Sequence, residues 1–166
     1  MTTKIPSGVL PLLQELYLER NGLTNLPSDI SELTQLETLD LSSNRFDQIP
    51  ECISTLQKLR NLVLNQNNIT EIPTNISNLT ALNAFRAEGN SITEISEDLL
   101  NNCLALREIS LEVNKISVVP ASISNLTGLR MISLANNLLV EFPTALFANG
   151  VMHYAKLNNN QVSIFG

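Results

Sequence analysis

Apolar side chains recur along the chain with one fixed period. Seven copies of an apolar pattern begin 23 residues apart, except for one spacing of 24. The first residues of the copies are Leu13, Leu36, Leu59, Leu82, Leu106, Leu129 and Met152. Apolar residues follow three and five positions after each start, and their spacing of two places them on one face of an extended strand. The pattern therefore predicts a repeat architecture in which seven strands stack on one another.

One polar residue keeps a fixed place in this apolar frame, eight positions after each start. It is Asn21, Asn44, Asn67, Asn90, Asn114, Asn137 and Asn160. A buried amide must be hydrogen-bonded, and it can both donate to and accept from backbone groups. We therefore predict a structural ladder of asparagines that binds the backbone where each strand ends.

The second half of each copy has a different apolar spacing. Steps of three and four, as in Ile69, Ile72, Ile76 and Leu79, favour short helical or irregular segments with one stripe facing the core. A proline recurs where the chain turns, at Pro27, Pro50, Pro73, Pro120 and Pro143. The fourth copy has Ser96 there and one extra residue, which we expect to bulge on the outer side.

The frame L-x-x-L-x-L-x-x-N-x-L-x-x-L-P-x-x-I-x-x-L resembles the leucine-rich-repeat family over residues 13 to 166. The resemblance implies an α/β fold: a right-handed solenoid, a curved horseshoe segment with a parallel concave β-sheet and short helical, 3-10 or irregular convex segments. The 23-residue wording with L-P-x-x-I is similar to the intracellular Ras-group repeats of Ras-binding scaffolds, Ras suppressor proteins and the Scribble and Erbin proteins.

The expected organisation is a partial repeat or N-terminal cap at residues 1–12, followed by seven repeats. Their bounds are 13–35, 36–58, 59–81, 82–105, 106–128, 129–151 and the incomplete 152–166. Solenoid ends expose an apolar layer unless they are capped. The layer of Val162, Ile164 and Phe165 is therefore a candidate surface for weak dimer formation, and a monomer is the alternative.

Composition limits the classes of partner and the cellular compartment that we expect. Ten Lys and Arg against 16 Asp and Glu give a net charge of −6, which disfavours nucleic acid and acidic lipid as partners. The sequence has no secretory signal and no apolar run long enough to insert into a membrane. With only Cys52 and Cys103, it also lacks the cysteine clusters of many secreted repeat domains, so we expect a cytoplasmic protein.

The variable positions of the predicted strands define a candidate binding face, called the concave face below. It consists of three columns of residues that begin at Glu15, Tyr17 and Glu19. The candidate partner-binding residues are Glu15, Tyr17, Glu19, Asp40, Val63, Arg86, Glu88, Glu108, Glu112, Met131, Tyr154 and Lys156. Six acids against two bases would attract a basic partner surface, and Tyr17, Met131 and Tyr154 would supply anchors. The alternative is an ordinary solvated sheet face.

Residues for chemistry are missing from the sequence. The single histidine, His153, has no cysteine or second histidine near it, and no phosphate-binding glycine loop is present. We therefore expect no catalytic, cofactor or metal site, and no enzymatic activity.

Three hypotheses for function remain. The first is a scaffold that binds a protein partner on the acidic concave face, with a basic surface, a small GTPase or a phosphatase as candidate partners. The second is a regulatory segment of a larger signalling enzyme, such as a phosphatase, kinase or cyclase. The third is self-association through the uncapped C-terminal repeat.

Overall fold

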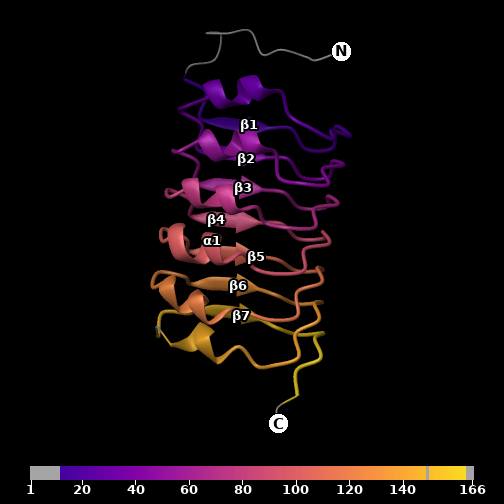
Figure 1. The fold of residues 1–166 in the computed structure, drawn as a ribbon, viewed down its shortest axis with the longest axis vertical. Helices are drawn as coiled ribbons and strands as arrows, with labels where there is room; N and C mark the ends of the chain where they lie inside the picture. The colour runs from indigo at the N-terminus through magenta and orange to yellow at the C-terminus, as the bar shows by residue number, and fades with distance from the viewer. Residues whose placement is uncertain (1–11, 149, 164–166) are drawn as a thin grey trace.

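Seven strands stack in chain order into one parallel sheet in the computed structural model, which describes residues 12–148 and 150–163 (Figure 1). The strands are β1 (Glu15–Tyr17), β2 (Thr38–Asp40), β3 (Asn61–Val63), β4 (Ala84–Arg86), β5 (Glu108–Ser110), β6 (Met131–Ser133) and β7 (Tyr154–Lys156). Each pairs with the equivalent residues of the next repeat, so that Leu39 lies beside Leu62 and Asp40 beside Val63. The expected leucine-rich-repeat solenoid is confirmed.

The hydrophobic core lies between the sheet and the outer segments. The middle residue of each strand points into it, and Leu39, Leu62 and Phe85 are fully buried. Isoleucines of the outer segments, such as Ile53 and Ile76, close the core from the other side. Because aliphatic side chains repeat in register, each layer stacks on its own equivalent, and the core continues through the molecule.

The outer side carries short helical turns, as the apolar spacing predicts. The 3-10 helices are η1 (Ser28–Glu32), η2 (Glu51–Thr55), η3 (Thr74–Asn78), η4 (Ala121–Asn125) and η5 (Thr144–Phe147). Each follows a proline directly, and these N-cap prolines have φ between −59° and −78°, the range that the proline ring favours where the chain turns into the helix.

The extra residue of the fourth repeat changes the type of its outer helix. In place of a 3-10 turn this repeat has α1 (Glu97–Asn102), the α-helix of the described residues, and Ser96 takes the proline position as its N-cap residue. Leu99, Leu100 and Cys103 are fully buried beneath it. The insertion is thus absorbed on the outer side, while the strand register from β4 to β5 is kept.

The asparagines bind the backbone of two neighbouring repeats. The side-chain N–H groups of Asn137 donate to the carbonyls of Leu111 and Leu134 at 2.9 and 3.1 Å, and its Oδ1 accepts from the N–H of Ile116 at 2.9 Å. Asn44 and Asn67 make equivalent bonds, and these side chains are buried. Each asparagine therefore ties the end of its own strand to the preceding repeat.

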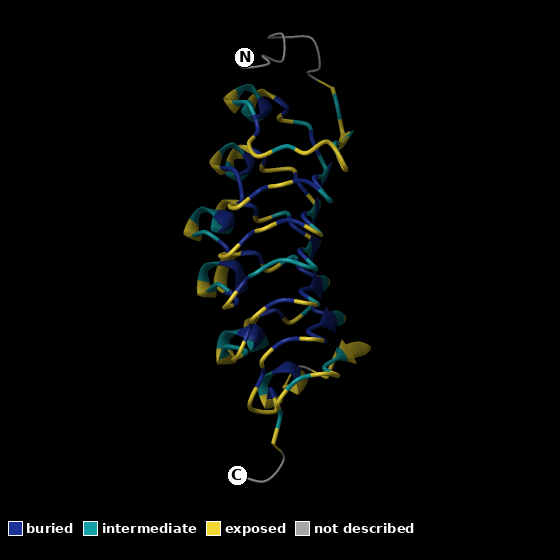
Figure 2. Ribbon diagram, turned by 90° about the vertical axis from the view of Figure 1, so that its right-hand side faces the viewer, coloured by how far each residue is buried: buried dark blue, intermediate teal, exposed yellow. Residues whose placement is uncertain are grey.

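The stack bows gently, with the strands on the inner side of the bend and the helical turns on the outer side (Figure 2). A helical turn is wider than the spacing of about 4.8 Å between neighbouring strands. Because every repeat adds one of each, the outer side is longer than the sheet side, and the stack bends toward the sheet. The bend makes the sheet face concave.

Candidate protein-binding face

The strand register brings the predicted columns of the concave face together. One column runs from Glu15 through Thr38, Asn61, Ala84, Glu108 and Met131 to Tyr154. The central column runs from Tyr17 through Asp40, Val63, Arg86, Ser110 and Ser133 to Lys156. Strands about 4.8 Å apart give this face a length of roughly 30 Å, enough for a standard protein interface.

The N-terminal half of the concave face holds acids without a cation partner. Tyr17 is 57% exposed, and its hydroxyl donates to the Glu15 carboxylate at 3.0 Å. Asp40 accepts from the backbone N–H of Ser42 at 2.8 Å. Glu19 is exposed, and in the described part of the chain no Lys or Arg forms an ion pair with Glu15, Glu19 or Asp40. The hydrogen bond and negative charge of Glu15 raise the pKa of Tyr17.

In the C-terminal half, by contrast, the acids are bound to neighbouring side chains. Arg86 Nη2 lies 2.6 Å from Glu108 Oε2, and Nε contacts the other carboxylate oxygen, which is a bidentate pair. The hydroxyl of Ser110 donates to Glu88 at 2.7 Å. This half of the face is consequently less acidic than a count of residues suggests.

Glu112 is held by two neighbouring side chains. Lys156 Nζ lies 2.8 Å from both of its oxygens, and the Ser133 hydroxyl donates to it as well. The hydrogen bond from Lys156 and then that from Ser133 lower the pKa of Glu112. The same contact raises the pKa of Lys156. The pair is therefore charged across the neutral range.

The apolar candidates differ in how much surface they offer. Tyr154 is 49% exposed at the C-terminal end of the face, whereas Val63 and Met131 are half-buried between their neighbours. Tyr17 and Tyr154 are thus the two large side chains with surface free for a partner. They lie on the two outermost strands, β1 and β7.

Three residues noted in the sequence lie outside the columns of this face. His153 is exposed, Cys103 is fully buried and Cys52 is partly exposed. Within residues 12–148 and 150–163 there is no cluster of side chains able to hold a metal ion. No helix in the same part of the chain has the length and apolar character needed to cross a bilayer. Residues 1–11 of the expected cap, and Ile164 and Phe165 of the expected dimer layer, lie outside the described residues.

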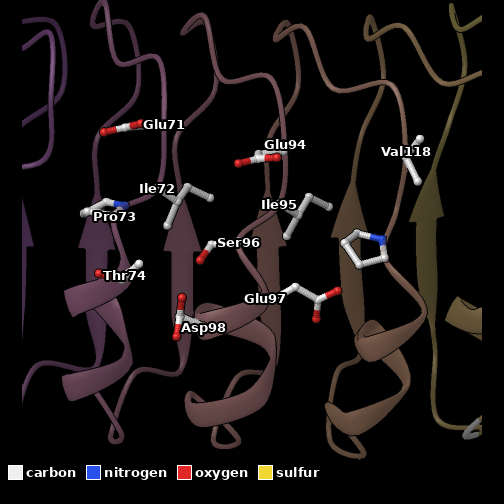
Figure 3. Close-up of a pocket in the computed structure, with 11 residues that line it drawn as sticks. Glu71, Ile72, Pro73, Thr74, Glu94, Ile95, Ser96, Glu97, Asp98 and Val118 are labelled. Atoms are coloured by element: carbon white, nitrogen blue, oxygen red, sulfur yellow. The ribbon is translucent and has the colours of Figure 1, made fainter.

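Sequence reasoning missed a second surface, at the corner where each repeat enters its outer helix. Glu71 and Glu94 lie there at equivalent positions of neighbouring repeats, on one side of Ile72 and Ile95, and Glu97 and Asp98 of α1 lie on the other side (Figure 3). Their 23-residue spacing was the available signal. The outer half of the repeat is defined by its apolar stripe, so two exposed acids between apolar positions do not stand out as a site.

Comparison with known proteins identifies the family. The sequence matches the leucine-rich repeat region family over residues 7–100 and a second leucine rich repeat family over residues 80–139. The chain belongs to the leucine-rich-repeat family. Members of this family are generally protein-interaction modules. No curated protein sequence matches the chain.

Several solved structures are similar to this one. A leucine-rich-repeat protein of Leptospira interrogans superposes with a TM-score of 0.86 at 26% identity, over 90% of this chain. A plant ice-binding protein superposes with a TM-score of 0.75 at 28% identity, over 91% of this chain. The leucine-rich-repeat ectodomain of the Arabidopsis thaliana receptor kinase GASSHO1/SCHENGEN3, solved with Casparian strip integrity factor 2, gives 0.74 at 27% identity over 83%.

These relatives are longer than the chain. It spans 38% of the Leptospira protein, 50% of the ice-binding protein and 17% of the receptor ectodomain.

Proposed function

We propose that this protein binds a protein or peptide partner on the concave face, and that the partner carries basic side chains opposite Glu15, Glu19 and Asp40. The observation that carries the proposal is the uneven charge of the face. The acids of β1 and β2 have no cation partner among the described residues, whereas Glu108 and Glu112 are already paired. Unpaired carboxylates on one end of a face attract a basic surface and orient it.

Tyr17 strengthens this proposal. It lies among the unpaired acids and presents more than half of its surface to solvent. An aromatic ring with a rigid hydrogen-bonded hydroxyl gives a large contact area at low entropic cost, and arginine stacks well on such rings. The receptor ectodomain described above, which was solved with a bound factor, provides a precedent for partner binding by this fold.

The test is affinity capture from the native cell extract, followed by titration calorimetry with each recovered partner after purification. The bait is the wild-type chain or the Glu19→Arg/Asp40→Arg variant, and the matched control is Asp47→Arg/Glu141→Arg, which changes the same charge at exposed positions away from the face. A partner lost with the first variant and kept with the control supports the proposal. A partner that binds all three equally places the binding surface elsewhere.

The consensus sequence of the repeats suggests a more specific class of partner. Because the 23-residue frame with L-P-x-x-I resembles Ras-group repeats, we include small GTPases and phosphatases among the partners to be tested directly. The relevant measurement is calorimetry of the chain with a purified GTPase in its GDP-bound and GTP-bound forms. A preference for one nucleotide state that disappears in Glu19→Arg/Asp40→Arg would assign this class.

A second candidate function is to recognise a signal as one segment of a larger signalling protein. It is favoured by the similarity to the ectodomain of a receptor kinase, of which this chain covers only 17%. In that case the concave face would bind the signal, and another part of the parent protein would respond. The full coding sequence tests this candidate, because a catalytic domain beside the repeats would support it.

A further inference from the structure

An apolar groove crosses the outer corner of the solenoid, away from the concave face. It has a volume of about 730 Å³ and runs over the third, fourth and fifth repeats (Figure 3). A smaller hollow of about 190 Å³ shares Glu71, Pro73 and Thr74 with it and extends it to the second repeat. The groove includes Ser96, where the fourth repeat departs from the proline pattern.

The floor of the groove is apolar and rigid. Ile72 and Ile95 form it from neighbouring repeats, and both are also part of the buried core. Pro73 and Pro120 border it, and Val118 presents 59% of its surface to solvent at the position where the two preceding repeats have Glu71 and Glu94. A floor that belongs to the core needs little reordering when a ligand covers it, which favours binding.

The rim of the groove is acidic and contains no cation. Glu71, Glu94, Glu97 and Asp98 line it, and Glu51 borders the smaller hollow. No Lys, Arg or His belongs to either lining, and the described residues give these carboxylates no side-chain hydrogen bond or ion pair. They differ in this from Glu108 and Glu112 of the concave face, which have partners within the chain.

Glu97 and Asp98 have an additional structural role, because acids in the first turn of α1 stabilise that helix. Glu71 and Glu94 precede the helical turns and have no such role. They occupy the same position of adjacent repeats, and both line the groove. A cationic side chain bound between them would interact with both carboxylates.

We propose that the groove binds a short extended peptide segment in which arginine or lysine side chains flank an apolar side chain. The apolar side chain would cover Ile72, Ile95 and Val118, and the basic ones would pair with Glu71 and Glu94. Four repeats extend over roughly 15 Å, which corresponds to about four to five residues of extended chain. This length suits a peptide rather than a single amine, and the negative rim disfavours nucleic acid and acidic lipid.

The experiment titrates the ¹⁵N-labelled full chain with a capped synthetic hexapeptide of alternating arginine and leucine, followed by NMR. We expect saturable shifts at Ile72, Ile95, Ser96 and Val118. In Glu71→Gln/Glu94→Gln we expect the affinity to fall about tenfold, because two surface ion pairs are lost. Neither residue lies in a helix or forms a side-chain hydrogen bond or ion pair with the described residues, so this variant keeps the fold.

The matched control is Glu32→Gln/Asp47→Asn, which removes the same charge at exposed positions outside both linings and outside the concave face, and should leave the affinity for the hexapeptide unchanged. Shifts confined to the concave face, equal loss of affinity in both variants, or no saturable binding would each overturn the proposal. Because the two surfaces are separate, failure here leaves the proposed function of the concave face unaffected.

Discussion

Lys156 on β7 reaches across β6 to Glu112, which follows β5, and its ammonium nitrogen lies 2.8 Å from both carboxylate oxygens. The two residues are 44 positions apart in the sequence, nearly two repeats. Most contacts of a solenoid join adjacent repeats, whereas this one joins repeats that are not neighbours. It therefore couples the last described strand to the interior of the stack.

This pair gives the stability of the protein a defined pH dependence. The pKa of Glu112 in the folded protein is lowered from 4.5, so its contribution is present above that value and is lost as the pH falls through the folded pKa. The pKa of Lys156 is raised from 10.5, so its contribution is lost only as the pH rises through the folded pKa, above 10.5. We expect urea denaturation to show Glu112→Gln as less stable than wild type at pH 7. The difference should shrink below pH 4, and a difference independent of pH would contradict this assignment.

The asparagine ladder predicts that replacing a buried asparagine by alanine lowers the stability more than replacing an exposed one. Asn137→Ala leaves the Ile116 N–H and the carbonyls of Leu111 and Leu134 without their side-chain partner in a buried place. We expect the free energy of unfolding to fall by about 3 kcal/mol, since each unsatisfied buried group costs roughly 1–3 kcal/mol. Asn21→Ala is the matched control, because Asn21 is exposed and, among the described residues, its side chain donates only to carbonyls of its own repeat. Denaturation of both variants measures the contrast, and equal losses would show that the ladder does not depend on burial.

Val113 has an unfavourable backbone conformation. Its φ is +54°, in the left-handed region, and its side chain is 52% exposed, so little packing compensates for the strain of a β-branched residue there. Asn136 and Asn159 occupy the equivalent place in the next two repeats with nearly the same φ. We expect Val113→Asn to stabilise the protein by about 1 kcal/mol, or roughly 2–4 °C in Tm, measured by calorimetry.

Gly89 provides the opposite test at the same place of the fourth repeat. Its φ is +64°, and a methyl group added there would overlap the side chain of Gln66. We expect Gly89→Ala to lower the free energy of unfolding by about 1 kcal/mol. Should Val113→Asn destabilise the protein while Gly89→Ala does not, the backbone conformation would not be the deciding factor.

The two cysteines should differ strongly in reactivity. Burial raises the pKa of Cys103 to about 11, and its side chain is fully enclosed beneath α1. At pH 8 only about one thiol in a thousand of that pKa is ionised, so alkylation requires unfolding. Cys52 is partly exposed on η2 and should be modified first, although burial raises its pKa as well. Mass spectrometry after iodoacetamide treatment of native and unfolded protein checks the order, and equal labelling of both in the native state would refute it.

The repeat period alone predicts most of the fold. Leucine spacing identifies the strands and their inward residues, the proline positions mark the start of the outer turns, and the extra residue of repeat four is correctly assigned to the outer side at Cys103 and α1. These features could be predicted because each depends on residues within one 23-residue unit or on its direct copy. Identical units must stack in register, since any shift would expose the leucines of every layer.

The sequence by itself determined the family, the strand register and the list of residues on the concave face. Only the tertiary structure decided which of those residues are neutralised. Glu112 is paired with Lys156 and Glu108 with Arg86, whereas Glu15, Glu19 and Asp40 have no basic partner within the part of the chain that the structure describes. Pairing depends on side-chain reach across the stack and on the direction of each rotamer, and neither follows from spacing along the chain. The acidic groove at the outer corner has the same origin, because its walls come from three repeats and its depth depends on how α1 is seated among them.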